Sequence, residues 1–435
     1  MKKYIYIFLV ILYSKYSLSQ ISMDRNYSSG WLENRKYDIG PGIKLGDRLV
    51  FHPGIGVEGG YDNNIFLFPS EPIGAGRIRV TATLDLATRS KQREGEKAKP
   101  HSLDFDFGCL VIYNEYLSDN QAAQQQRNID IEATLNLILF PQRIFSFFIF
   151  DNFLRHIEPR YDLTEGYSIN KDRNVAKLGF KIAPGQGAFE VKLSYSFIIN
   201  YYENGGNLSI LGDSMEHEID LSIKWKFLPK TAFIFHGQFM PIFHKDEVTT
   251  TGVRNYSSYH AKGKIGLIGL FTPKFSLLAE VGYGAGFYEE NTPDVDTIIG
   301  RAELIFKVTP FVRIRIGYDR DFRDSLWANY FIRDYGYLIY SHLIAGKVLL
   351  ELKGGFSWFS YATFQYQGFR YNRRDPIVSA SLFVEYRILN WLGINGVVSY
   401  TGNFSDFRWY DFIGDQIVPT DYQKVIFMIG ARVRY

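Results

Sequence analysis

Charged side chains recur at every second position in many segments of this chain, with apolar residues between them. Arg313 and Arg315 alternate with isoleucines, and Asp104 and Asp106 alternate with phenylalanines. Successive side chains of a β-strand point to opposite faces, so each segment predicts a strand with one charged and one apolar face. Charged faces that line a common water-filled space favour ions of one sign. The chemistry that these residues indicate is therefore the handling of ions or polar solutes.

Alternation assigns many charged residues to one shared inner surface. Bases outnumber acids among them, which favours anions, whereas charge pairing across neighbouring strands that only stiffens the wall is the alternative. We expect this interior to be wet, because desolvating so many charges is costly unless all are paired. The predicted lining residues are Arg77, Arg79, Asp104, Asp106, Asp130, Glu132, Lys177, Lys181, Lys192, Glu218, Asp220, Lys224, Lys262, Lys264, Arg301, Glu303, Arg313, Arg315, Asp319, Glu351 and Lys353.

The histidines and the cysteine do not follow a catalytic or metal-binding pattern. The chain has 8 histidines, but no Gly-x-Ser-x-Gly sequence marks a nucleophile. His236 and His244 share one face of one predicted strand, yet their spacing along it is about 27 Å, too far for one metal ion. The single cysteine, Cys109, excludes a disulfide framework and a Cys-rich zinc site. We therefore expect no enzyme activity, no cofactor and no metal.

Three carboxylates gather near the end of another predicted strand. Asp319, Asp321 and Asp324 would resemble a metal-binding cluster, but Arg320 and Arg323 lie between them and are expected to pair with them. The net charge of +3, from 49 basic and 46 acidic residues, is too balanced to indicate a nucleic-acid partner.

Tight, mostly proline-containing turns alternate with long polar loops, so that the chain reads as hairpins of about 40 residues. Pro141, Pro184, Pro229 and Pro273 mark four of the tight turns. Tight turns on one side and long loops on the other are typical of an outer-membrane barrel. The predicted strands, about 18 in number (16–18), are 47–62, 77–88, 101–115, 128–140, 143–156, 174–183, 188–201, 215–227, 231–244, 257–270, 274–287, 297–308, 311–323, 329–342, 345–358, 376–388, 391–401 and 421–435.

Two features favour a membrane barrel over a soluble sandwich with buried apolar faces. Aromatic residues such as Tyr113, Trp225 and Phe287 lie near strand ends, as they do at bilayer interfaces. The chain also finishes on an alternating strand with an aromatic last residue. Because no strand edge can stay unpaired in lipid, the sheet must close. We predict an all-β fold: a single-chain antiparallel transmembrane β-barrel with short periplasmic turns and long extracellular loops.

The first residues have the pattern of a secretory signal peptide. Lys2 and Lys3 precede an apolar stretch, and small residues at Ser17 and Ser19 form a cleavage site. We predict a signal peptide at 1–19, a periplasmic arm or plug segment at 20–46, and the barrel at 47–435.

Two short motifs resemble those of known outer-membrane barrels. Gly430, Val433 and Tyr435 resemble the C-terminal insertion signal of bacterial outer-membrane barrels, with Met428 where a polar residue is usual. The run Gly59 to Phe66, at the end of the first predicted strand, resembles the opening of the type-2 β-barrel porin family, in which a Gly-Tyr-Asp-x-Asn-Val/Ile-Phe sequence recurs. This resemblance implies transport or envelope biogenesis, with the outer-membrane bilayer and the barrel-assembly machinery as partners.

Two functions fit these expectations. The first is a porin-like channel in the outer membrane that passes small polar solutes through a charged, water-filled lumen. The second is a barrel component of an envelope machine for polysaccharide export, secretion or motility, or an adhesin. Aromatic-rich segments at 358–374 and 404–412 and the N-terminal arm motivate the second, with a polysaccharide or a periplasmic protein as partner.

Overall fold

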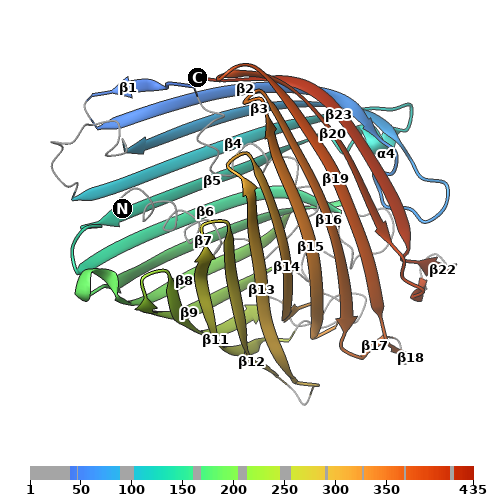
Figure 1. The fold of residues 1–435 in the computed structure, drawn as a ribbon. Helices are drawn as coiled ribbons and strands as arrows, with labels where there is room; N and C mark the ends of the chain where they lie inside the picture. Colours follow the sequence, from blue (N-terminus) through green and yellow to red (C-terminus); the bar gives the residue numbers. More distant parts are fainter. Residues whose placement is uncertain are drawn as a thin grey trace.

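Alternating apolar and polar residues build one closed antiparallel sheet (Figure 1). The computed structural model describes residues 40–46, 48–88, 102–159, 168–203, 213–244, 256–289, 292–325, 328–366, 369–411 and 416–435. Within these ranges the main sheet has 19 strands, of which β1 (Ile43–Leu45) lies on the rim. The wall strands are β2 (Leu49–Asp62), β3 (Ala75–Thr88), β4 (Leu103–Leu117), β5 (Asn128–Leu139), β6 (Phe145–Pro159), β7 (Ser168–Ile182), β8 (Phe189–Glu203), β9 (Ser214–Leu228), β10 (Thr231–His244), β11 (Ser258–Thr272), β12 (Phe275–Tyr288), β13 (Val295–Thr309), β14 (Val312–Asp324), β15 (Tyr330–Ile344), β16 (Val348–Tyr361), β19 (Arg374–Leu389), β20 (Leu392–Asn403) and β23 (Tyr422–Arg434).

The first and last wall strands close the barrel. β2 pairs with β23 from Gly54 opposite Arg434 to Asp62 opposite Ile426. Every other wall strand pairs in antiparallel register with the strands before and after it. The all-β, antiparallel barrel of about eighteen strands predicted from the sequence is therefore confirmed in the described residues.

Short elements outside the wall are few among the described residues. A single helical turn, α4 (Gln121–Gln124), and a 3₁₀ turn, η2 (Gly185–Gly187), lie between wall strands. Two small hairpins, β17 (Phe364–Tyr366) with β18 (Phe369–Tyr371) and β21 (Arg408–Asp411) with β22 (Gln416–Pro419), lie in the loops. In the described part of the chain, none of the helices has the length and apolar composition needed to cross a bilayer.

Strand boundaries differ most from the sequence prediction at β7. The prediction starts this strand at 174, but it begins at Ser168 and pairs with both β6 and β8. The residues before 174 are polar, as in a loop, but they continue the hydrogen-bonded pairing of β7 with β6 and β8. The predicted signal peptide and most of the predicted arm, 1–39, lie outside the described residues, as do residues 160–167 and 204–212 of two predicted loops.

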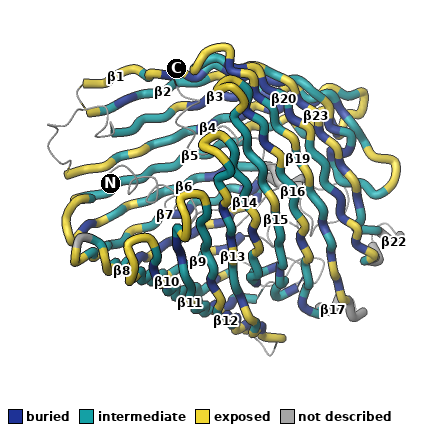
Figure 2. Tube along the Cα trace, viewed as in Figure 1, coloured by how far each residue is buried: buried dark blue, intermediate teal, exposed yellow. Residues whose placement is uncertain are grey.

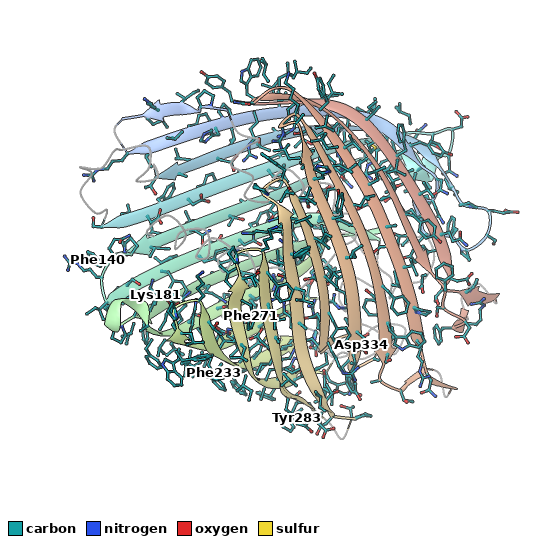
Figure 3. All side chains as sticks on the ribbon, in the orientation of Figure 1. Phe140, Lys181, Phe233, Phe271, Tyr283 and Asp334 are labelled. Atoms are coloured by element: carbon teal, nitrogen blue, oxygen red, sulfur yellow. The ribbon has the colours of Figure 1, made fainter. Side chains whose placement is uncertain are left out.

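The two faces of the wall differ in chemistry. On β9 the outward residues Ile219 and Trp225 are 48% and 53% exposed, whereas the charged Glu218 and Asp220 beside them are half-buried. Figure 2 shows the same alternation of exposed and covered residues along most wall strands, and Figure 3 shows side chains standing on both faces. The apolar outer face and the polar inner face suit a wall with lipid outside and water inside.

Glycines mark two places where the backbones of neighbouring strands approach closely. At the β2–β23 seam, a Cβ at Gly430 would lie 2.2 Å from the Val57 carbonyl oxygen, and one at Gly60 would lie 1.8 Å from that of Phe427. At the β11–β12 pair on the other side of the ring, a Cβ at Gly282 would lie 1.8 Å from the Gly263 oxygen. No side chain fits at such distances, so these glycines allow the neighbouring strands to fold toward each other.

Strand β1 pairs with the first residues of β2, which the pairing of β2 with β23 does not reach. The pairing of β23 with β2 ends near Pro53, and β1 pairs with Leu49 to Phe51 beyond it. The Gly40 amide donates to the Arg434 carbonyl oxygen at 3.1 Å. The start of the described chain therefore lies beside its end, at the rim with the tight turns.

Candidate functional site

The inner face of the barrel carries the charged residues that the sequence singled out. By strand parity and register, all of the predicted lining residues lie on this face, as Arg79 on β3 (7% exposed) and Glu351 on β16 (3% exposed) illustrate. Their alternate neighbours, such as Leu352 on β16, point outward and are exposed.

Many of these charges are paired across or along strands. Buried or half-buried ion pairs join Arg79 to Glu58, Lys177 to Glu218 (3.1 Å), Lys192 to Glu190 (3.3 Å), Lys353 to Glu351 (3.1 Å), Arg434 to Asp85 (2.7 Å) and Arg432 to Glu385 (2.6 Å). His236 pairs with Glu280, and His156 lies 3.2 Å from Asp130. Part of the interior thus acts as a cross-linked wall.

Three other bases of the inner face form no hydrogen bond or close ion pair within the described part of the chain. Lys181, Lys264 and Arg315 make no hydrogen bond with another described residue, and the Nε of Arg315 is buried. Lys307 and Arg313 stand directly opposite each other on β13 and β14. On the facing strands the acids gather instead, where Asp104 and Asp106 neighbour Asp85 near the tight-turn rim. Three bases of the inner face, one each on β7, β11 and β14, are thus left without a hydrogen-bonded partner among the described residues.

The outer end of β14 stays paired with β15, but its pairing with β13 ends at Arg320 and it packs onto the inner wall. Phe322 is fully buried, although its parity would place it outside, and its ring lies 5.0 Å from the ring of His260. A Cβ at Gly284 would come within 2.7 Å of the Phe322 ring, so the absence of a side chain at Gly284 makes room for it. Val295 and Ile299 complete this apolar cluster.

Polar contacts hold the same strand end. The Lys262 ammonium donates to Asp321 at 2.7 Å and to the Phe322 carbonyl oxygen at 2.8 Å. Asp324 accepts a hydrogen bond from the Tyr288 hydroxyl at 2.8 Å and lies 2.9 Å from Nε2 of His260. We call the segment Asp321 to Asp324, with its contacts to β10, β11 and β12, the mouth clamp. His244 completes it, 3.7 Å from Asp324.

The mouth clamp corrects the expected pairing of the β14 carboxylates. Arg320 lies on the outer face, where it donates to both oxygens of Asp334 at 2.7 and 2.6 Å. Asp319 pairs with Arg333 at 3.3 Å, and Asp321 and Asp324 take the partners described above. The expectation was wrong for Arg320, because this residue lies on the opposite face of β14 from Asp319 and Asp321 and reaches Asp334 instead. Arg323 shares the face of Asp321 and is one of the charges that act on it. In the described residues, no group of three or more His, Cys, Asp or Glu side chains could hold a metal ion.

Sequence reasoning missed several residues of this region. Arg173 was left out because the predicted strand began one residue after it. Arg323 shares the parity of Arg313 and Arg315, so its inward position could have been found from alternation. The partnership of His260 with Asp324 had no local signal, because 64 residues separate them and the end of β14 that carries Asp324 packs onto the inner wall, although parity places Asp324 on the outer face.

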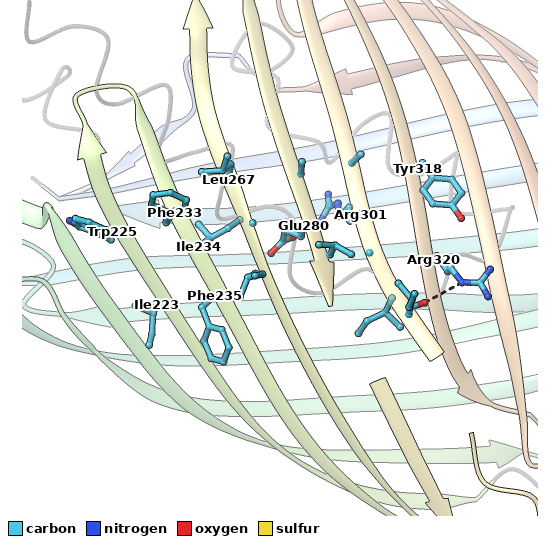
Figure 4. Close-up of a pocket in the computed structure, with 18 of the residues that line it drawn as sticks. Ile223, Trp225, Phe233, Ile234, Phe235, Leu267, Glu280, Arg301, Tyr318 and Arg320 are labelled. Atoms are coloured by element: carbon cyan, nitrogen blue, oxygen red, sulfur yellow. Dashed lines mark hydrogen bonds between the residues drawn. The ribbon is translucent and has the colours of Figure 1, made fainter. Parts of the chain in front are cut away.

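Two hollows accompany the wall. A recess of about 40 Å³ on the inner face is lined by Arg77, Arg79, Asp130 and Glu132, among others, and gathers four of the predicted lining residues. A larger apolar depression of about 1070 Å³ is lined mainly by outward residues of β9 to β14 (Figure 4). Its lining includes Ile265 and Ile298, which are 62% and 63% exposed. This depression belongs to the lipid-facing surface and not to the lumen.

A closed sheet with an apolar exterior and a charged interior defines the class of transmembrane β-barrels, because only closure satisfies every backbone group in lipid. No protein-family profile matches the chain, and no curated protein matches it either. Among solved structures, OpdK of Pseudomonas aeruginosa, determined with vanillate, is 8% identical with a TM-score of 0.45, over 88% of this chain and 99% of its own. OccAB4 of Acinetobacter baumannii is 10% identical with a TM-score of 0.45, over 88% and 98%. The barrel assignment itself comes from the strand register of this chain.

Proposed function

We propose that this protein is an outer-membrane channel that passes small polar solutes through its charged lumen, with a preference for anions. The single observation that supports this most is the closed barrel of eighteen long strands with lipid-compatible residues outside and half-buried charges inside. A barrel of this size has room for water-filled space, because narrower barrels of about eight strands are filled by side chains.

The anion preference follows from the balance of paired and unpaired charges. Carboxylates of the inner face such as Glu218, Glu351 and Glu385 are held by bases, whereas Lys181, Lys264 and Arg315 keep no hydrogen-bonded partner among the described residues. Unpaired charge sets the sign of the potential in a pore. The cross-strand ion pairs stiffen the wall, and the bases without a hydrogen-bonded partner favour anions. Each of the two interpretations of the interior charges therefore applies to its own set of residues.

Planar-bilayer recording tests the proposal. Refolded protein spanning Gln20 to Tyr435 is placed between unequal KCl solutions, and its folded state is checked by heat-modifiable mobility on gels. We expect stable conductance steps and a reversal potential displaced toward that of chloride. If folded protein gives no conductance steps, the channel proposal is contradicted. The alternative is then the envelope-assembly role, in which the barrel docks a periplasmic protein or a polysaccharide machine through residues 20–46. Comparing pull-downs with and without that segment then identifies such a partner.

A further inference from the structure

The hydrogen-bonded ladder between β13 and β14 ends before either strand does. Its last pair joins Gly300 to Arg320, although β13 begins at Val295 and β14 continues to Asp324. Over these residues β13 stays paired with β12, and β14 stays paired with β15. The wall is therefore split at its loop end, within residues that the structure describes, and the end of β14 packs behind β12 and β13 instead of beside β13. We call this interruption of the ladder the lateral split.

Side chains satisfy backbone groups that the lateral split leaves without a strand partner. If the ladder continued in register, its next hydrogen-bonded pair would be Ile298 with Phe322. Instead, Nε of Arg320 donates to the Ile298 carbonyl oxygen at 3.1 Å, as the dashed line in Figure 4 shows. The Phe322 amide donates to the Asp321 carboxylate at 2.9 Å, and the Phe322 carbonyl oxygen accepts from Lys262 at 2.8 Å. Because unpaired strand edges are costly in lipid, these contacts allow the split to persist in a membrane.

The lateral split lies between an apolar depression on the outer surface and the buried cluster behind the wall. The depression, about 1070 Å³ in volume, is lined among others by residues 298–300 of β13 and by Tyr318 and Arg320 of β14. Ile299 is fully buried and also belongs to the inner cluster that contains Phe322. Apolar contacts therefore continue from the lipid-facing surface to the Phe322 ring on the inner side of the wall.

Polar groups stand at the loop-side end of the same depression. Arg320 and Asp334 form an ion pair at 2.6 Å on the outer face, and the Tyr318 hydroxyl donates to Asp334 at 2.5 Å. Tyrosines and charged residues at such a position are typical of the membrane–water interface. The rest of the lining is mainly apolar, and Ile265 within it is 62% exposed. A molecule with one polar end and one alkyl chain matches both parts of this surface.

We propose that the lateral split is a passage through which single-chain amphipathic molecules move between the lumen and the membrane, with Phe322 as its gate. This activity goes beyond the channel function proposed above, because it concerns molecules that partition into lipid. Opening requires the end of β14 to move away from the inner face of β12 and β13. No backbone hydrogen bond between β13 and β14 has to break for this movement, since side chains already occupy those groups.

Thiol labelling from within the bilayer tests the passage in the full-length refolded barrel. The native cysteine is removed by Cys109→Ala, and Val295→Cys places a reporter in the cluster behind the split, where Val295 is 3% exposed. The probe is N-dodecylmaleimide dissolved in the liposome membrane, with excess glutathione in the water to remove reagent that would arrive through the lumen. We expect Phe322→Ala to raise the labelling rate of the reporter at least about tenfold, because losing a buried ring favours opening by more than that factor. Dodecanol in the membrane should slow this labelling by competing for the same path.

The matched control reporter is Ser357→Cys. Ser357 is 4% exposed on the inner face of β16, where the ladders to both neighbouring strands are intact. Its labelling should stay unchanged when Phe322→Ala is added. The passage is overturned if Phe322→Ala does not accelerate labelling of Val295→Cys, if Ser357→Cys shows the same acceleration, or if glutathione abolishes the labelling or dodecanol fails to slow it.

Two features of the design keep the result decisive. Heat-modifiable mobility on gels checks that each variant is folded, and Phe322→Leu, with a smaller expected acceleration, replaces Phe322→Ala if the alanine variant does not fold. Labelling requires no ion current, so the outcome stands whether or not the protein conducts. A barrel that conducts but fails the labelling test would retain the channel proposal and lose the lateral passage.

Discussion

Truncation of Phe322 to alanine isolates the contribution of the mouth clamp. The side chain is fully buried and fills a site bounded by Gly284, Ile299 and His260. Removing a buried phenylalanine ring costs about 3–5 kcal/mol, and each 1.4 kcal/mol is a factor of ten in an equilibrium. The equilibrium between a docked and a released clamp should therefore shift toward release by a factor of about one hundred to a few thousand. Because the lost contacts join the end of β14 to the inner wall and leave the wall ladders intact, the barrel should remain folded.

Single-channel recording reads this change directly. A released strand end widens the mouth, so we expect a larger and noisier open-channel current from Phe322→Ala than from wild type. Phe306→Ala is the matched control, since Phe306 is 42% exposed on the outer face and touches no part of the clamp. The reasoning fails if folded Phe322→Ala and wild type give the same conductance and noise, or if Phe306→Ala reproduces the effect.

Three further changes test other features. Gly430→Leu should lower the fraction of protein that refolds to the heat-modifiable form, because a Cβ there would lie 2.2 Å from a backbone oxygen, whereas Gly336→Leu, with open space around it, should refold normally. Lys264→Glu with Arg315→Glu should displace the reversal potential in unequal KCl toward that of potassium, and an unchanged potential would argue against anion selection by these bases. Asp324→Asn removes the charge that two histidines face, so the released clamp and its current noise should become more frequent, while the unfolding midpoint of the barrel in urea should change little.

The wall could be predicted from sequence because its determinants are local. A residue such as Arg315 or Leu352 shows its face by the residues directly before and after it, and a short turn fixes where the next strand starts. The predicted and observed strands therefore agree along most of the chain. β7 departs from the prediction because composition does not show where a neighbouring ladder will extend a polar segment.

The mouth clamp could not be predicted in the same way. Phe322 should point outward by parity, and its inward position depends on a space left by glycines on β12. Asp324 finds its partners on β10, β11 and β12, so its contacts depend on how strongly the barrel bends. The contacts of Phe322 and Asp324 therefore depend on the three-dimensional shape of the closed barrel, and no single segment of the sequence specifies them.

The contact between the two ends of the described chain has a consequence for engineering. A Cβ on Gly40 would lie 3.0 Å from Tyr435, and the Gly40 amide already donates to the carbonyl oxygen of Arg434. A short linker could join these ends and new termini could be opened at the tight turn at Pro310, giving a circular permutant with the same strand neighbours. In that permutant the linker would connect β23 to the start of the described chain, so that β23 and β2 would pair as successive wall strands. The barrel would instead close by the pairing of β13, then the last strand, with β14, then the first. The refolding rate of the permutant would then show whether the seam limits closure by its position in the chain or by its geometry.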